Sequence, residues 1–374
     1  MRELINQVIA FFLSLRLTVW CLLLLSILTV AGTLYQVDYG LYTAQERFFN
    51  SWVVLFWGFL PFPGTQLVLA FLFLNLLANM VLRFSYGWRQ SGIVLIHMGL
   101  MLLLAGGWVT RQFGQESFLT LQEGESSNLA SSYHKWEVAA WRQAPGPVRD
   151  VVAIDADYAA PGRVLPFDDF GLELVVEEYH RHARAFRSTD PDADFGILNA
   201  TGLIRLDPAR PHWEPQENIP GGTFMIRTED GHQQPLLLFG GDRAPTVFTM
   251  EDEEIVFSLR RKRYPLPMNI SLINFERTFH PNSDIPRSFA SFIEVDLQGV
   301  TRDVLIEMNR PFRYQGYTFY QASYADLEQG GHLSTFAIVL NHGRIIPYLA
   351  TAMTFLGLAV HFLIELARRR RMTP

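Results

Sequence analysis

Four stretches of this chain are apolar on every side and contain no Asp, Glu, Lys or Arg. All-round apolar character is typical of helices surrounded by lipid and by other helices, and a span of the hydrocarbon layer requires about 20 residues. The pattern therefore predicts four transmembrane helices, at residues 17–36, 65–82, 91–110 and 345–364.

A further uncharged run, residues 48–60, lies between the first two predicted helices and is rich in Trp and Phe. The sequence Pro-Phe-Pro-Gly at 61–64 closes it, and Trp is enriched at membrane–water interfaces. We expect an interfacial helix or a re-entrant cap here rather than another span.

The long segment between the third and fourth predicted helices is polar, and short alternating or β-branched runs recur along it between Pro, Gly, Asn and Asp. These runs predict strands at residues 117–121, 136–141, 151–158, 172–179, 255–259, 268–275, 291–297, 304–308, 318–323 and 334–340. Antiparallel sheets bury alternate residues in this way, so a sandwich-like domain is expected. The predicted fold class is an α-helical membrane protein with four transmembrane helices plus a large β-rich exported domain.

The predicted domains are a membrane region at 1–110, an exported domain at 111–344, and a last helix with a basic tail at 345–374. Basic residues cluster before the first helix, in the link between the second and third, and after the fourth: Arg2, Arg16, Arg83, Arg89 and Arg368 to Arg371. The positive-inside rule then places both termini in the cytoplasm and residues 111–344 outside. The Arg tail and the general character of the chain favour a bacterial inner membrane over a thylakoid, so the exported domain is expected in the periplasm. We expect the first helix to be retained rather than cleaved as a signal peptide.

Composition excludes several classes of function. A formal net charge of −6 gives no support for nucleic-acid binding, and about half of the residues are apolar. Cys21 is the only cysteine, so there is no intrachain disulfide, no CxxC redox pair and no CxxCH motif. The sequence contains no nucleophile elbow or phosphate loop, so a hydrolase or a nucleotide-driven enzyme is not indicated.

His97 is the most informative candidate residue, because it lies inside the third predicted helix, roughly 9 Å from its cytoplasmic end. A titratable group at such a depth is costly unless it is paired, and functional roles are common there. Neutral imidazole is a good axial ligand for haem iron, and it also serves as an ordinary hydrogen-bonding partner for a neighbouring helix. Both roles remain open from the residue alone.

Other candidates lie at a comparable depth or in the exported domain. His361 in the fourth helix makes a bis-histidine arrangement conceivable, although a histidine so close to the interface more often reaches headgroups or water. Arg83 and Arg89 could pair with the carboxylates of a bound cofactor, but such charges more often set the topology and contact lipid phosphates. His180 and His182 would share one face of a strand as a weak metal pair, and His280 is expected in a turn.

Three segments carry a family resemblance: LSLRLTVWCLLLLSILTVAGTLYQ (13–36), HMGLMLLLAGG (97–107) and NRPFRYQGYTFYQASY (309–324). In these segments the chain resembles the ResB family, also called CcsB, of system II cytochrome c maturation. The layout of three helices, a large exported domain and one helix is similar as well, whereas residues 125–260 match only in general character. Within the third segment, Gly316 permits a tight turn and the following strand offers an aromatic surface.

The resemblance implies a function. Such proteins form a complex with a CcsA-like (ResC-like) membrane protein that carries a tryptophan-rich haem-handling motif, and the complex moves b-type haem across the membrane and attaches it to CxxCH motifs of apocytochrome c. His97 matches the family's haem-ligating histidine, so the chain would be a haem-delivery subunit of a haem lyase and not catalytic alone. Separate thiol-reducing proteins would keep the substrate reduced, and Tyr317, Tyr320 and Tyr324 are candidates for contact with apocytochrome. Two alternatives remain: a structural scaffold without haem ligation, and a haem b subunit of a membrane redox complex.

Overall fold

The computed structural model describes residues 1–84, 86–143, 150–188, 196–199, 202–250, 253–297, 299–328 and 330–372. The chain forms two compact units, one made of Met1–Gln115 with Leu340–Pro374 and the other of Glu116–Val339. We call them the membrane unit and the β unit and describe each by itself.

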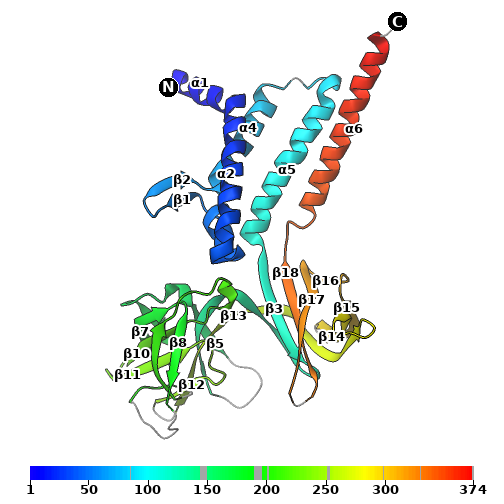
Figure 1. Cartoon of the computed structure of the whole chain (residues 1–374). Coiled ribbons are helices and arrows are strands. Elements are labelled where there is room, and N and C mark those ends of the chain that lie inside the picture. The colour runs from blue at the N-terminus through cyan, green and yellow to red at the C-terminus, as the bar shows by residue number, and fades with distance from the viewer. Residues whose placement is uncertain are drawn as a thin grey trace. The chain divides into compact units, whose positions relative to one another are not determined.

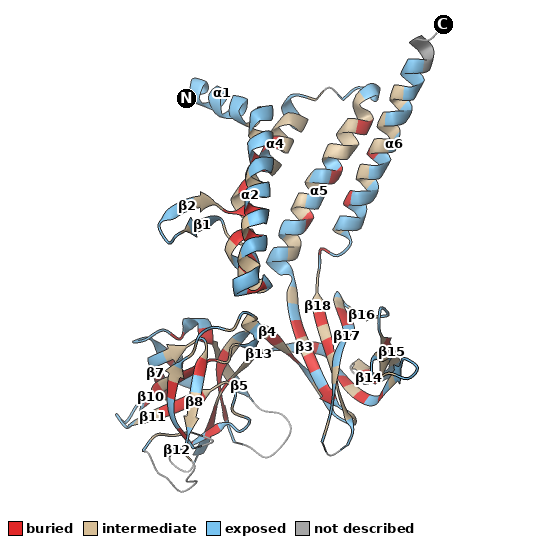
Figure 2. Ribbon diagram, viewed as in Figure 1, coloured by how far each residue is buried: buried red, intermediate tan, exposed pale blue. Residues whose placement is uncertain are grey.

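The membrane unit is helical (Figure 1). Four of its helices are long and apolar enough to cross a membrane: α2 (Leu15–Tyr39), α4 (Thr65–Leu82), α5 (Ser91–Phe113) with the preceding 3-10 turn η2 (Trp88–Gln90), and α6 (Ile346–Met372). Their outward faces are exposed, apolar side chains, as expected for contact with lipid (Figure 2). The four predicted spans are therefore confirmed, and the protein is a membrane protein.

Shorter elements complete this unit. They are α1 (Arg2–Phe12), α3 (Leu41–Ala44), the π-helical turn η1 (Gln45–Phe49), β1 (Val53–Phe56) and β2 (Leu60–Pro63). The last two form an antiparallel hairpin that pairs Phe56 with Leu60. The interfacial helix considered for residues 48–60 is thus wrong, because the chain reverses at Trp57 and Gly58, both with positive φ.

The described residues of the β unit form sixteen strands and short 3-10 turns. The strands are β3 (Gln115–Gln122), β4 (Ser126–Arg142), β5 (Val151–Asp155), β6 (Val164–Phe167), β7 (Leu172–His180), β8 (Ala183–Arg187), β9 (Leu203–Pro208), β10 (Gly221–Thr228), β11 (Gln233–Phe239), β12 (Thr246–Met250), β13 (Glu253–Phe279), β14 (Pro286–Leu297), β15 (Val300–Glu307), β16 (Phe312–Tyr314), β17 (Tyr317–Asp326) and β18 (His332–Leu340). The pairings with a described register between these strands are antiparallel, as predicted.

Two cores stabilise the β unit. The first lies between the four-stranded sheet β11-β10-β7-β6 and part of a ten-stranded sheet, with Phe167 and Phe224 facing Phe257, so this part is a sandwich. The second lies within the ten-stranded sheet, whose main path is β15-β14-β13-β4-β3-β18-β17-β16, with β12 paired to β13 and β5 paired to β4. This path curls until β14 meets β17. At that meeting the Ser291 hydroxyl donates to Gln321 Oε1 over 2.7 Å.

Strand β13 contributes to both cores. Phe257 lies in the first core and Ile270 in the second, and the strand pairs with β4 and then also with β14. The two strands predicted at 255–259 and 268–275 are therefore one strand of 27 residues. The prolines that suggested a break, Pro265 and Pro267, lie where the pairing with β4 is irregular, between Pro265 and Ile270.

Candidate functional site

His97 lies in the first half of α5, and its ring is held in one orientation. Its Nδ1 lies 2.8 Å from the backbone carbonyl oxygen of Ile93, one helical turn earlier. Because a carbonyl oxygen only accepts, Nδ1 carries the hydrogen, and the lone pair of the neutral ring is on Nε2. The ring of Phe84 contacts it edge-on, with centroids 5.0 Å apart.

A cavity of about 390 Å³ opens beside His97, within the size range of small-molecule sites. It lies between α2, α4 and α5, near the end of the helices where α2 begins and α4 ends. Four of the lining side chains are apolar, and the other six carry hydroxyl, amide, guanidinium or imidazole groups. The residues that line it are Leu15, Thr18, Asn75, Leu76, Asn79, Arg83, Phe84, Gln90, Ile93 and His97.

A buried asparagine organises the wall opposite His97. Asn75 is 1% exposed, and its Oδ1 accepts a hydrogen bond of 2.7 Å from the Thr18 hydroxyl. Its Nδ2 donates to the carbonyl oxygens of Phe12 and Ser14, at the break between α1 and α2. These bonds join the start of α2 to α4 and so fix the width of the cavity. Asn75 was not among the predicted residues, although an amide inside an apolar span was the available signal.

The two arginines predicted to meet carboxylates differ in position. Arg83 lines the cavity, and its guanidinium donates to the carbonyl oxygen of Leu13 over 3.4 Å. Arg89 is exposed on η2 and is not among the lining residues. The structure therefore brings Arg83, but not Arg89, to the cavity that His97 lines.

His361 is not among the residues that line the cavity. Its backbone packs against Gly92 of α5, where a Cβ atom would come within 2.5 Å of the His361 nitrogen. Since each residue turns a helix by about 100°, His97 lies roughly 140° around α5 from Gly92. The two histidines consequently face different sides of α5, and a bis-histidine pair within this unit finds no support.

The three tyrosines predicted to contact apocytochrome c do not form one surface. Tyr317 packs on the second core, whereas Tyr324 lies between the rings of Phe275 and Phe289. Only Tyr320 is exposed, at 42%. The tight turn expected at Gly316 is present, because Gln315 and Gly316 both have positive φ between β16 and β17.

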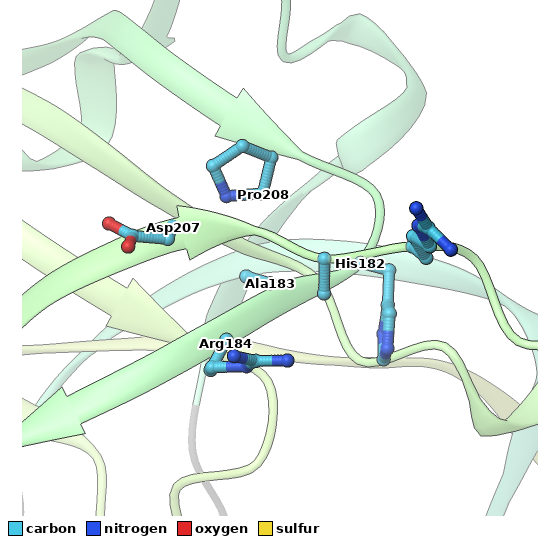
Figure 3. Close-up of a pocket in the computed structure, with 7 residues that line it drawn as sticks. His182, Ala183, Arg184, Asp207 and Pro208 are labelled. Carbon is cyan, nitrogen blue, oxygen red and sulfur yellow. The ribbon is translucent and has the colours of Figure 1, made fainter.

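The weak metal pair at His180 and His182 is not formed. His180 ends β7, but the chain bends before β8, which pairs in a different sheet, so the alternation expected of one strand does not apply. His182 Nδ1 instead accepts a hydrogen bond from the Ile219 amide. His182 lines a polar pocket with Arg184 and Asp207 (Figure 3), and within the described parts of the chain no three His, Cys, Asp or Glu side chains group as metal ligands. His280 does begin a turn, as expected, and its carbonyl accepts from Ser283.

Comparison with known proteins identifies the chain's relatives. The model of the ResB-like family matches residues 224–371, from β10 to α6. Protein NrfI of Wolinella succinogenes is 23% identical over 354 residues, which are 93% of this chain and 34% of NrfI. The chain thus spans about a third of the length of that relative. His97 lies outside the part that the family model matches, so its role depends on the geometry above.

Proposed function

We propose that this chain, which belongs to the ResB-like family, acts in cytochrome c biogenesis as the haem-delivery subunit of a system II cytochrome c synthase. It does so with a CcsA-like membrane protein, and haem is the cargo of the complex rather than a resident cofactor. The single observation that carries this proposal is the fixed ring of His97 at the wall of a cavity. Metal-ligating histidines typically donate their second ring N–H to a carbonyl or carboxylate, as Nδ1 does here to Ile93.

The residues of the cavity fit a flat macrocycle with carboxylate side chains. Leu15, Leu76 and Ile93 supply apolar walls, and Phe84 supplies an aromatic edge. Arg83, at the end of α4, supplies a guanidinium, which pairs with carboxylates through two parallel hydrogen bonds. The Nε2 lone pair of His97 is the axial ligand, and the second ligand comes from the partner.

The direction of transport follows from the proposed topology. The cavity lies near the cytoplasmic ends of α2, α4 and α5, so haem enters from the cytoplasm, and covalent attachment takes place in the periplasm beside the β unit. The chain itself has no thiol pair, since Cys21 is its only cysteine. Other proteins therefore reduce the CxxCH cysteines of apocytochrome c, and the chain is not catalytic by itself.

The test is an absorbance spectrum of the complex with its CcsA-like partner, purified in detergent. We expect His97→Ala to lose the haem bands, His97→Gly to regain them when imidazole is added, and His361→Ala to keep them. Full pigment in the His97→Ala complex would refute the proposal. Stoichiometric haem in the lone chain, lost in either histidine variant, would favour a permanent haem b subunit, and no haem in any complex would favour a scaffold.

A further inference from the structure

The β1–β2 hairpin lies alongside the body of α2. Just before it, the ring of Phe49 packs on Gly32, so closely that a Cβ atom there would lie 2.7 Å from that ring. Gly32 is seven residues from the end of α2 at Tyr39, which is about 10 Å along the helix. The chain has therefore turned back beside α2, and in Figure 1 the hairpin projects at a level between the two ends of that helix.

The length of α4 leads to the same depth. At about 1.5 Å per residue, its 18 residues span about 27 Å, whereas the 25 residues of α2 span about 37 Å. The hydrogen bond between Thr18 and Asn75 sets the two helices level near their other ends. From that level α2 runs about 32 Å further to Tyr39, whereas α4 runs only about 15 Å to its first residue, Thr65, so α4 begins well short of the end of α2. The side chain of Gln66, in the first turn of α4, donates to the Phe49 carbonyl and fixes this level. The hairpin thus occupies the depth that α4 leaves empty.

One face of the hairpin is packed and the other is exposed and apolar. Val54 is 1% exposed and packs with Leu28 and Val68 of the helices. Leu55 is 49% exposed on the opposite face, and the tip residues Trp57 and Phe59 are 79% and 76% exposed. From Phe48 to Leu82 the sequence contains no charged residue and no histidine. A contiguous exposed apolar surface of this kind marks a contact with lipid or protein.

Strand β2 has few free backbone donors on its outward edge. The Gly64 amide donates to the Trp52 carbonyl across the hairpin. In an antiparallel pair, hydrogen-bonded and non-hydrogen-bonded residue pairs alternate. The backbone groups of the pairs Val53–Pro63 and Leu55–Pro61 therefore point outward, away from the partner strand. Proline has no N–H, and so neither outward position of β2 exposes an unpaired donor. On β1, the outward carbonyl of Leu55 accepts from Arg47, which also donates to the Tyr35 hydroxyl. Unpaired backbone groups cost several kcal/mol each in a bilayer. The two prolines remove two such donors and Arg47 satisfies one acceptor, whereas the outward N–H groups of Val53 and Leu55 remain on β1.

We propose that the β1–β2 hairpin is a re-entrant element whose tip, Trp57 to Phe59, lies among lipid acyl chains in the leaflet that holds the C-terminal end of α2. The missing donors on β2 also prevent another strand from adding at that edge. Lipid is thus the occupant that depth, lack of charge and proline placement together favour. This inference is independent of haem binding, because the hairpin and the His97 cavity lie toward opposite ends of α2.

The experiment is a site-directed spin-labelling measurement, which is straightforward because only one native cysteine, Cys21, has to be replaced. In a Cys21→Ala background, Trp57→Cys and, separately, Phe59→Cys carry a nitroxide label in proteoliposomes. Leu74→Cys, on an exposed position in the middle of α4, is the lipid reference, and Asp230→Cys, in an exposed turn of the β unit, is the water reference. Collision of each label with oxygen and with a water-soluble nickel chelate is measured by electron paramagnetic resonance.

We expect both hairpin labels to collide frequently with oxygen and rarely with nickel, as the label at position 74 does. Nickel accessibility equal to that at position 230 would place the tip in water and overturn the proposal. Low collision with both reagents would place it against another protein surface, such as a second copy of the chain, and would overturn it equally.

Discussion

At the scale of single residues, Asn75 is the side chain whose loss should disturb the His97 cavity most. It is buried and bonds to Thr18 and to two backbone carbonyls. Asn75→Leu leaves those groups without a partner, and we expect it to lower the free energy of unfolding by about 1–3 kcal/mol. Thermal unfolding in detergent measures this loss.

A double-mutant cycle with Thr18→Val separates the contributions. Hydrogen bonds between membrane helices contribute on average about 0.6 kcal/mol, so the coupling between the two side chains should account for the smaller part of the effect. A coupling as large as the whole loss would mean that the carbonyls of Phe12 and Ser14 do not depend on Asn75.

Two tyrosines of β17, Tyr320 and Tyr324, should differ in role, the first in binding and the second in stability. Tyr320 is exposed, so we expect Tyr320→Ser to leave the melting temperature unchanged and to weaken capture of apocytochrome c if this surface binds it. Tyr324 packs between two aromatic rings, each such pair contributing about 0.5–1.5 kcal/mol, so Tyr324→Ser should lower the melting temperature. Equal melting temperatures for the two variants would contradict this assignment.

At the scale of elements, the contact between α5 and α6 depends on glycine. A Cβ atom at Gly99 would come within 2.8 Å of the Ala350 carbonyl oxygen, whereas one at Gly107 would meet nothing within 4 Å. We expect Gly99→Ala to destabilise the membrane unit by about 1–3 kcal/mol, through overpacking of two backbones. Gly107→Ala is the matched control, and helix propensity should make it neutral or slightly stabilising. Comparable thermal unfolding of both variants in detergent would show that the helices do not pack at Gly99.

Strands β13, β17 and β18 are joined by one carboxylate. Asp326 accepts hydrogen bonds from Arg277 over 2.8 Å and from His332 over 2.9 Å, and these two partners, Arg277 first, hold the pKa of Asp326 below its usual value. Because the pKa of Asp326 is lower in the folded chain, its carboxylate stabilises the fold at pH values above its pKa in the unfolded chain, about 3.9. This stabilisation is lost as the pH falls through the pKa of Asp326 in the folded chain. We expect the melting temperature of the native chain to fall more steeply between about pH 5 and pH 3 than that of Asp326→Asn. Parallel curves would show that the ion pairs contribute nothing to stability.

Element type was predictable where one periodic pattern was long and uninterrupted. All-round apolar runs predicted the four spans, because a helix satisfies its backbone hydrogen bonds within a single segment and so can stand in lipid by itself. The β1–β2 hairpin was not predictable, since its identity depends on a positive φ at Trp57, which few bulky residues adopt. Strand β13 was divided at Pro265 and Pro267, because the sequence does not reveal that the pairing with β4 becomes irregular there. At the site, His97 was predictable because it is a titratable group in an apolar span. Its hydrogen bond to Ile93 was not, because the orientation of the ring depends on the three-dimensional structure.

At the scale of the whole molecule, both ends of the β unit belong to adjacent strands. Strand β3 begins the unit, β18 ends it, and the two are neighbours in the ten-stranded sheet. The buried residues of its cores all come from within Glu116–Val339. A unit with its own cores and neighbouring ends meets the requirements for independent folding. We therefore expect residues 116–339, expressed alone, to form a soluble domain with a β-type circular dichroism spectrum and one or two cooperative melting transitions.

A chain that lacks the β unit tests which unit binds haem and which positions the substrate. If α5 is joined to α6 by a short Gly/Ser linker in place of residues 116–339, the contacts of Gly92 and Gly99 with α6 remain, and so does every residue that lines the His97 cavity. We expect this chain to retain haem with its partner while failing to mature cytochrome c, because inner haem binding would reside in the membrane unit and positioning of the substrate in the β unit. Loss of pigment from the joined chain, with α5 and α6 still in contact by cross-linking, would mean instead that the β unit is required for haem to bind at all.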